Sequence, residues 1–165
     1  MEEKLVPVTV LFLFFDVELR RKGTVAMRVT CFGHRELINT SSIRDILNTV
    51  FQKLIQEGAA KFFLGGYGEF DRIATSVLNT LKQNYPYITV ILVIPYPNQK
   101  CDLTLYDSSV YPPLENVPAR YAILRRNEWM VDQSDIVVSY IRHPFGGAFN
   151  TTAYAKRRKK RIILL

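Results

Sequence analysis

The sequence lacks the residue patterns that mark disulfide-rich, zinc-binding and membrane-spanning proteins. Its two cysteines, Cys31 and Cys101, lie far apart without metal-ligand spacing, which excludes a disulfide framework and favours a reducing compartment, the cytoplasm. No paired-histidine metal motif is present, and we expect neither a metal nor a cofactor. The apolar run over residues 8–15 is shorter than the roughly 20 residues that a membrane span needs, so we expect no membrane association.

Several familiar nucleotide-binding and catalytic motifs are also missing. No Gly-Lys-Ser/Thr triplet follows a glycine-rich turn, which excludes a Walker A loop, and no G-x-G-x-x-G fingerprint is present. A G-x-S-x-G nucleophile elbow and a cysteine–histidine pair with usable spacing are absent as well. The sequence therefore gives little support to catalysis by the common hydrolase machinery.

Basic residues are concentrated in one short segment rather than spread over the chain. The formal net charge is +7, from 22 basic and 15 acidic residues. Six of the basic residues are consecutive, namely Lys156, Arg157, Arg158, Lys159, Lys160 and Arg161. Such a run would bind nucleic acid or an acidic partner. The alternative is a solvated helix end, where cations suit the negative pole of the helix dipole.

Residues 1–26 differ from the rest of the chain, and we treat them as an extra N-terminal segment. Their apolar run would form an additional strand or an anchor laid on the domain. A second hypothesis is that the segment is a mis-annotated leader and that the natural protein begins at Met27. Residues 20–23 can be encoded by purine-rich codons shortly before Met27, as in a ribosome-binding site. A peptide from residues 5–19 in mass spectrometry of the natively expressed protein would exclude this hypothesis.

From Met27 onward, strand-like and helix-like segments alternate, which predicts a single domain over residues 27–165. The expected strands cover residues 28–32, 61–64, 88–94, 135–140 and 162–165. The expected helices run from Ser41 or Ser42 to Gly58 and over residues 69–83, 118–133 and 146–159. A long irregular connection is expected over residues 95–117. This order predicts an α/β fold, a Rossmann-like three-layer α/β/α sandwich with a mostly parallel sheet of about five strands.

Glycine-bearing turns follow three of the expected strands. Their glycines are Gly33, then Gly65, Gly66 and Gly68, and then Gly146 and Gly147. The carboxyl ends of parallel strands share one sheet edge, and ligands of such folds bind there. Free amides at the start of a helix favour an anion. The three turns together therefore predict a ligand site at this edge.

Polar residues beside the first two turns are candidate ligand contacts. His34 and Arg35 would hold a phosphate or a carboxylate, or would only face solvent. Glu69 and Asp71 would complement a helix dipole. Alternatively, they would accept hydrogen bonds from ribose hydroxyls or act as an acid or base.

Two later helices supply the remaining candidates. Arg126 would reach a phosphate from a polar helical face that also carries Asn127. Asn150 and Thr151 lie in the first turn of the last helix and would donate hydrogen bonds to a ligand.

Four blocks of the sequence together resemble the YpsA-like branch of the SLOG superfamily, which joins the DNA-processing protein DprA with the LOG cytokinin-activating enzymes. The blocks are TCFGHR at 30–35, GGYGEFD at 65–71, RNEWMVDQSD at 126–135, and GGAFNT at 146–151 followed by YAK at 154–156. The resemblance covers about residues 28–165. It implies a Rossmann-like fold, a small nucleotide-like ligand and self-association into a homo-oligomer.

The resemblance leaves three functions open. The leading one is a small-ligand-binding module that senses or binds a nucleotide or nucleotide derivative through the glycine-rich turns. The second is a LOG-like hydrolase of a nucleotide N-glycosidic bond, with Glu69 as the catalytic acid, base or nucleophile and Arg126 as the phosphate clamp. The turn at residues 144–151 departs from the LOG pattern by inserting Phe145, and Tyr154 stands near it in place of a glutamate. The third is a DprA-like nucleic-acid binder that uses residues 156–161.

Overall fold

The computed structural model describes residues 26–165, so the extra N-terminal segment expected over residues 1–26 lies almost wholly outside the described residues. The strands are β1 (Met27–Phe32), β2 (Ala59–Leu64), β3 (Thr89–Val93), β4 (Ser108–Val110), β5 (Ile136–Ser139) and β6 (Arg161–Leu164). The helices are α2 (Thr40–Gln56), α3 (Gly68–Leu81), the short 3-10 turn η1 (Ala119–Tyr121), α4 (Ala122–Gln133) and α5 (Gly147–Arg157).

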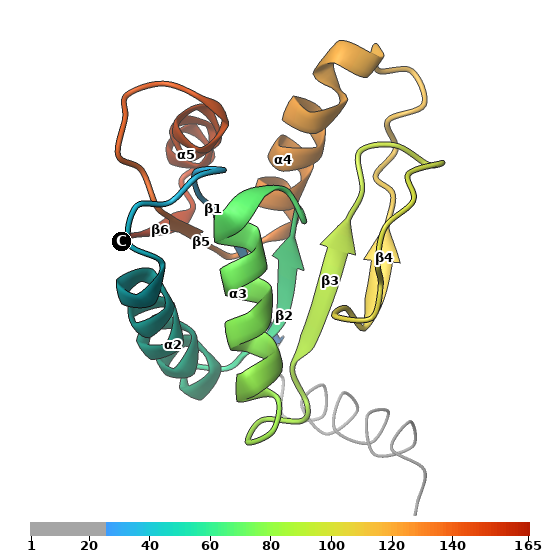
Figure 1. Cartoon of the computed structure of the whole chain (residues 1–165). Coiled ribbons are helices and arrows are strands. Elements are labelled where there is room, and N and C mark those ends of the chain that lie inside the picture. Colours follow the sequence, from blue (N-terminus) through green and yellow to red (C-terminus); the bar gives the residue numbers. More distant parts are fainter. Residues whose placement is uncertain (1–25) are drawn as a thin grey trace, which may run out of the picture.

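The six strands form one parallel sheet in the order β4-β3-β2-β1-β5-β6. The chain builds the sheet outward from β1 to β4, then crosses back through α4 and adds β5 and β6 on the other side of β1 (Figure 1). The strand order therefore reverses at β1, between its neighbours β2 and β5. In open α/β sheets a crevice forms at such a reversal, outside the carboxyl ends of the strands.

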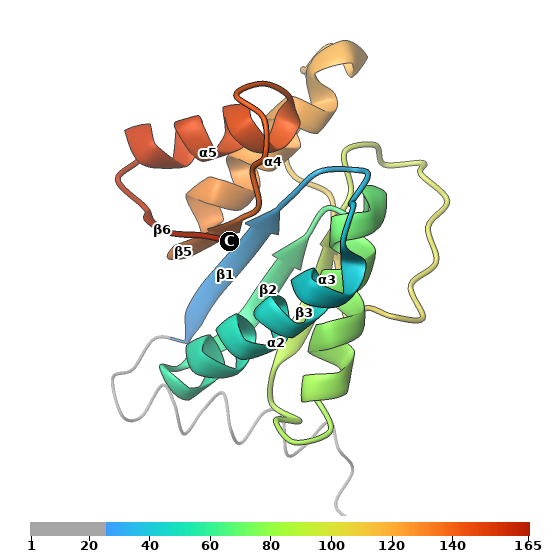
Figure 2. The same cartoon turned by 60° about the vertical axis from the view of Figure 1, so that its left-hand side comes forward.

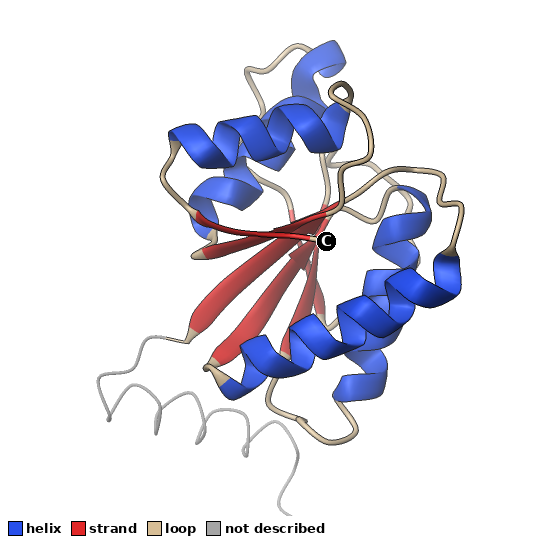
Figure 3. Ribbon diagram, turned by 90° about the vertical axis from the view of Figure 1, so that its left-hand side faces the viewer, coloured by secondary structure: helices blue, strands red, loops and turns tan. Residues whose placement is uncertain are grey.

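Helices cover both faces of the sheet, as Figure 3 shows, and this gives the expected three layers. Helices α2 and α3 lie together on one face (Figure 2), and α4 and α5 pack together on the other. The two faces take alternate side chains of each strand, because successive residues of a strand point to opposite sides. Phe62 packs in the core beneath α2 and α3, whereas Phe63 belongs to the core beneath α4 and α5.

Local sequence explains these elements. The strand β3 is apolar on both faces because helices cover both, and it buries Val90, Ile91, Leu92 and Val93. Helix α2 places its apolar side chains at helical spacing on one buried face, formed by Ile43, Leu47, Phe51, Leu54 and Ile55. Within residues 26–165, no helix combines the length and the apolar character needed to cross a membrane.

The structure confirms the α/β fold with its parallel sheet and corrects two details. The strand β4 was missed, because Ser108–Val110 contains a single apolar residue and lies at the sheet edge. Asp107 holds β4 against β3, since its carboxylate accepts from the main-chain N–H of Val90 at 2.7 Å. The N-cap of α2 is Asn39 rather than Ser41 or Ser42, and the Asn39 side chain accepts from the N–H of Ser42 at 3.3 Å.

Candidate functional site

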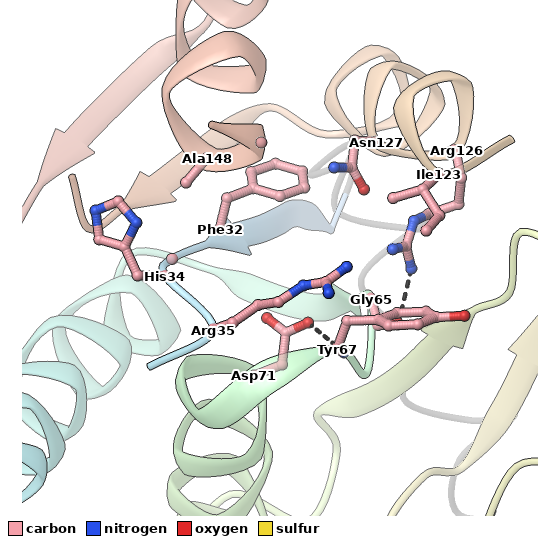
Figure 4. A pocket seen from close by; sticks show the side chains of 12 residues that line it. Phe32, His34, Arg35, Gly65, Tyr67, Asp71, Ile123, Arg126, Asn127 and Ala148 are labelled. Carbon is pink, nitrogen blue, oxygen red and sulfur yellow. Dashed lines mark hydrogen bonds between the residues drawn. The ribbon is translucent and has the colours of Figure 1, made fainter. Parts of the chain in front are cut away.

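A cavity of about 340 Å³ lies at the strand-order reversal, at the carboxyl ends of β1 and β2 and beside the N-terminal turn of α5 (Figure 4). The predicted site residues that line it are Gly33, His34, Arg35, Gly65, Asp71, Arg126, Asn127 and Gly147. The predicted residues that do not line it are Gly66, Gly68, Glu69, Gly146, Asn150 and Thr151. The fold thus brings residues from all three glycine-bearing turns, and from α4, to one place.

Asp71 places a buried carboxyl group in the cavity wall. Its side chain is 8% exposed, and one carboxylate oxygen accepts from the main-chain N–H of Tyr67 at 2.8 Å. Burial raises the pKa of Asp71 from its ordinary 3.8 to about 6. The hydrogen bond from Tyr67 and the positive charge of Arg126 lower this pKa but do not offset the burial. A carboxyl group with such a pKa is half-protonated near pH 6 and either donates or accepts a hydrogen bond there.

Arg126 brings a buried guanidinium group from α4 to the same wall. Its side chain is 2% exposed, and Nη1 donates to the carbonyl oxygens of Gly65 at 2.8 Å and Val93 at 2.7 Å. The guanidinium carbon lies 5.3 Å from the ring centroid of Tyr67. Burial lowers the pKa of Arg126 while Asp71 raises it, and the group stays charged at neutral pH. In the described part of the chain, its Nε has no hydrogen-bond partner.

The glycines after β2 allow close packing. A Cβ on Gly65 would stand 2.7 Å from Nη1 of Arg126, so a larger residue would displace the guanidinium group from its two carbonyl partners. Gly66 has φ +71°, and a Cβ there would meet the side chain of Leu92 at 2.6 Å. Gly68 has φ +87°, and a Cβ there would stand 2.7 Å from the Cα of Arg35. This turn is therefore occupied by the protein's own atoms.

Glu69 ties the loop after β1 to the start of α3. One of its carboxylate oxygens accepts from the main-chain N–H of Leu37 at 2.9 Å, and its own N–H donates to the carbonyl oxygen of Arg35 at 2.8 Å. The acidic residues in the first turn of α3 are Glu69 and Asp71. Their carboxylates lie at the positive end of the helix dipole and complement it. Glu69 therefore holds the loop after β1 against α3 and does not line the cavity. Its position does not support the catalytic role that the hydrolase hypothesis assigns to it.

The N-terminus of α5 is organised differently. Its N-cap, Gly146, has φ +92° and offers no side chain, and the first turn of the helix contains no acidic residue. A Cβ on Gly146 or Gly147 would have no neighbouring atom within 4 Å. Gly147 and Ala148 line the cavity, and the amides of this first turn have no acceptor within the helix.

Thr151 and Asn150 do not face the cavity. The buried hydroxyl group of Thr151 donates to the carbonyl oxygen of Gly147 at 2.7 Å and receives a 3.4 Å hydrogen bond from Asn127. Asn150 is exposed, and its main-chain N–H donates to the carbonyl oxygen of Gly146. Both residues therefore shape the first turn of α5, and Asn127 is the one of these polar side chains that lines the cavity.

His34 and Arg35 form the outer rim of the cavity. The side chain of Arg35 extends across the opening beside Asp71 (Figure 4), and it is exposed. The Nε2 atom of His34 accepts from the main-chain N–H of Arg142 at 2.8 Å. Burial lowers the pKa of His34, and the nearby His143 and Arg142 lower it further. His34 is therefore neutral at physiological pH in the unliganded protein.

The basic run lies away from the cavity, at the carboxyl end of α5 and the start of β6. Most of the run is engaged within the molecule, since three members form ion pairs or hydrogen bonds and Arg157 lies over the ring of Tyr154. Arg158 pairs with Asp132 at 2.7 Å, Arg161 pairs with Glu57 at 2.7 Å, and Lys160 donates to the carbonyl oxygen of Ser134. The exposed members that form no ion pair among the described residues are Lys156, Arg157 and Lys159.

Sequence reasoning missed four residues that line the cavity, which are Phe32, Tyr67, Ile123 and Ala148. Two of them carried a signal, since Phe32 ends a predicted strand and Tyr67 lies inside a predicted glycine turn. Ile123 and Ala148 are ordinary apolar helix residues, and only the packing of α4 and α5 brings them to the cavity. Within residues 26–165, no group of three or more His, Cys, Asp or Glu side chains is arranged to hold a metal ion.

A parallel sheet flanked by helices, with glycine turns around a cavity at the strand-order reversal, defines a Rossmann-like α/β domain of the SLOG type. The chain belongs to the YspA SLOG family, whose model, YpsA, matches residues 25–160. The uncharacterized SPbeta prophage-derived protein YoqJ of Bacillus subtilis (strain 168) is 26% identical over 140 residues, which cover 70% of this chain and 81% of YoqJ.

Two solved structures resemble this fold at low sequence identity. DNA processing protein A from Helicobacter pylori, described for its single-stranded DNA binding mode, has a TM-score of 0.61 and 18% identity. The match covers 84% of this chain but only 65% of that protein. The molybdenum cofactor carrier protein of Chlamydomonas reinhardtii has a TM-score of 0.60 and 16% identity, over 85% of this chain and 76% of the carrier. At these identities, both likenesses show the fold alone.

Proposed function

We propose that the domain binds a nucleotide or nucleotide derivative in the cavity, with a phosphate at the first turn of α5. The observation behind the proposal is the start of this helix, which borders the cavity without a side-chain cap or an acidic residue. Free main-chain amides and the positive pole of a helix dipole together bind anions. Among the described residues, no carboxylate lies in the first turn of α5, so a ligand would supply the anion.

Arg126 and Arg35 strengthen the case for an anionic ligand. Arg126 is almost fully buried in the cavity wall and keeps one N–H group, at Nε, without a partner among the described residues. Its fixed positive charge in the wall would attract an anion in the cavity. Arg35 adds a second guanidinium group at the rim. Two arginines against the single carboxylate of Asp71 leave the cavity positive.

The remaining walls suit the other parts of a nucleotide. The carboxyl group of Asp71 would accept from a ribose hydroxyl or from an amino group of the base. Phe32, Tyr67 and Ile123 supply aromatic and apolar surface for the flat base. The volume of about 340 Å³ falls in the range of small-molecule sites, which is roughly 300–1,000 Å³.

Isothermal titration calorimetry with AMP, GMP and their phosphate-free nucleosides tests this proposal. The informative variant is Gly147→Asp, which places a negative charge where the phosphate would bind, at a position with open space around it. We expect a nucleotide to bind the wild type and to bind Gly147→Asp at least tenfold more weakly. Gly147→Ala is the matched control, because it adds a Cβ without charge, and it should keep affinity within a few-fold.

Two results would refute the proposal. The first is that no nucleotide binds the wild type at millimolar concentration. The second is equal affinity of the wild type and Gly147→Asp, which would mean that the phosphate is not at α5. The nucleosides distinguish the phosphate from the base, since they should bind weakly and respond little to the charge at position 147.

Binding of single-stranded nucleic acid is a second candidate, favoured by the exposure of Lys156, Arg157 and Lys159. Three phosphate contacts would give a slope of log affinity against log salt of about −2, at about −0.7 per contact for single strands. Gel shifts of a single-stranded oligonucleotide between low and high salt measure this slope. If the triple alanine variant of these residues binds as well as the wild type, the basic run is not a nucleic-acid site.

Self-association, which the SLOG resemblance implies, also stays a proposal. Exposed apolar side chains near the N-terminal ends of α4 and α5 would suit a second copy, and they include Tyr121, Leu124, Phe145 and Phe149. Sedimentation at several protein concentrations, with and without nucleotide, measures the oligomeric state. A monomer under all conditions would exclude it.

A further inference from the structure

A second cavity, of about 430 Å³, adjoins the first on the outer side of the loop after β1. The two cavities share His34 and Arg35 in their walls, so they lie on either side of these two residues. The loop after β5 closes the far wall with Arg142 and His143. Arg142 and His143 are not among the ligand contacts expected from the sequence.

Basic side chains dominate the second cavity. Four of its lining residues are basic, namely His34, Arg35, Arg142 and His143, and Glu36 is the one acidic residue in its lining. Among the described residues, neither Arg35 nor Arg142 forms an ion pair with a carboxylate. The imidazole rings of His34 and His143 lie 5.3 Å apart. Two guanidinium groups without a carboxylate partner in the described part of the chain would attract an anion to this cavity.

The cluster is held in place by main-chain and ring contacts. The N–H of Arg142 donates to Nε2 of His34, so the two loops are joined independently of the Arg142 side chain. The ring of His143 stacks on Phe145 at 5.3 Å with an interplanar angle of 16°, and Phe145 itself is 67% exposed. These contacts orient the basic groups and leave the Arg142 guanidinium free to meet a ligand.

We propose that the ligand is a nucleotide with two separated phosphate groups, one at the first turn of α5 and the other in the second cavity against Arg142 and His143. This inference rests on the proposed function, because it assumes that a nucleotide occupies the first cavity. It narrows the ligand class from any nucleotide to one with phosphates on two separate ribose oxygens, as in a nucleoside 3′,5′-bisphosphate. Arg35, which lines both cavities, would lie between the two groups.

Calorimetry with AMP, ADP and adenosine 3′,5′-bisphosphate tests the proposal. AMP has one phosphate, ADP has two adjacent phosphates, and the bisphosphate has two that are separated. We expect the bisphosphate to bind the wild type at least tenfold more tightly than AMP and more tightly than ADP. The variant Arg142→Gln should remove this preference and leave AMP affinity unchanged, because it keeps the main-chain hydrogen bond to His34.

Arg72→Gln is the matched control, since Arg72 is an exposed arginine that lines neither cavity. It should keep the full preference for the bisphosphate. Equal binding of AMP and the bisphosphate to the wild type, or the same loss of preference in both variants, would overturn the inference while nucleotide binding stands. A wild type that binds none of the three probes would overturn the proposed function and this inference with it.

Discussion

The two double-glycine turns beside the cavity are similar in sequence and opposite in use. After β2, Gly65 lies beneath the guanidinium group of Arg126 and Gly66 lies against Leu92. After β5, a Cβ on Gly146 or Gly147 would have no atom within 4 Å. In the first turn glycine is required because the protein fills the space, and in the second the space is left open.

The helices that follow these turns differ in the same way. The first turn of α3 contains Glu69 and Asp71, and both carboxylates accept main-chain hydrogen bonds nearby. The first turn of α5 contains no acidic residue and its N-cap offers no side chain. A glycine-rich turn is therefore not in itself evidence of a ligand. The crowding around the glycines and the charge at the helix start decide whether the turn serves the fold or a ligand.

The largest effect should come from removing the group that fills the first turn. Arg126→Ala should lower the free energy of unfolding by about 3–5 kcal/mol, because Gly65 and Val93 lose a buried donor and Asp71 loses its compensating charge. Urea denaturation at pH 7 measures this loss. Arg125→Ala is the neighbouring control, an exposed arginine paired with Glu128, and should cost far less. Equal losses in the two variants would show that Arg126 does not support the turn.

The second prediction concerns the charge of Asp71. The folded-state pKa of about 6 lies above the ordinary 3.8, so the fold favours the protonated form. The stabilising contribution is fully present below about pH 4 and is lost as the pH rises through 6, a change of about 3 kcal/mol. Asn at this position does not titrate. The stability of Asp71→Asn relative to the wild type should therefore rise by about that amount between pH 4 and pH 7.

Denaturation curves of both proteins across this pH range provide the measurement. A difference between wild type and Asp71→Asn that does not change with pH would mean that the carboxyl group is not desolvated. The expected gain also has a functional cost, because the variant loses the carboxylate that the proposed ligand would contact.

The third prediction compares the two turns directly through the same substitution. Gly65→Ala should lower the free energy of unfolding by about 1–3 kcal/mol, since the new Cβ displaces the Arg126 guanidinium from its two carbonyl partners. Gly147→Ala should change it by less than about 0.5 kcal/mol, because the new Cβ meets nothing. Thermal or urea denaturation separates the two outcomes. Similar losses at both positions would remove the contrast between a crowded and an open turn.

The smallest expected effect concerns the N-terminal end of α5, where no acidic residue of the first turn complements the helix dipole in the absence of ligand. Gly147→Asp should raise the free energy of unfolding by about 0.3–1 kcal/mol relative to Gly147→Ala, because a carboxylate at a helix start complements the dipole. The gain should shrink at high salt. A loss of stability would indicate that the amides of this turn already have an anionic partner in the unliganded protein.

The sequence predicted the architecture well because the architecture depends on local apolar patterns. The apolar run Val90–Val93 and the apolar face of α2 can each be recognised within a short stretch of the sequence. The short strand β4 was not predictable in this way, since Ser108 and Ser109 give it almost no apolar signal. Its position depends on Asp107, whose carboxylate accepts from the distant Val90.

The sequence predicted where the candidate site lies, but not which glycine turn is open to a ligand and which is filled by packing. The glycine turns indicated the correct sheet edge. Which turn is open depends on contacts between residues far apart in the chain, such as Arg126 with Gly65, which are 61 positions apart. The hydrogen bond that holds the Glu69 carboxylate away from the cavity comes from the N–H of Leu37, 32 positions away. Such pairs cannot be inferred from one sequence, because spacing alone does not say which partners meet.

The walls of the cavity come from both halves of the chain, and this has a consequence for how the molecule opens. Phe32 and Asp71 belong to the first half, whereas Arg126 and Gly147 belong to the second. A bound ligand would act as a non-covalent staple between the halves and would slow hydrogen exchange of amides in β1 and α5 together. A nascent chain that has not yet reached α5 would lack one wall, so ligand capture would report that synthesis of the domain is complete.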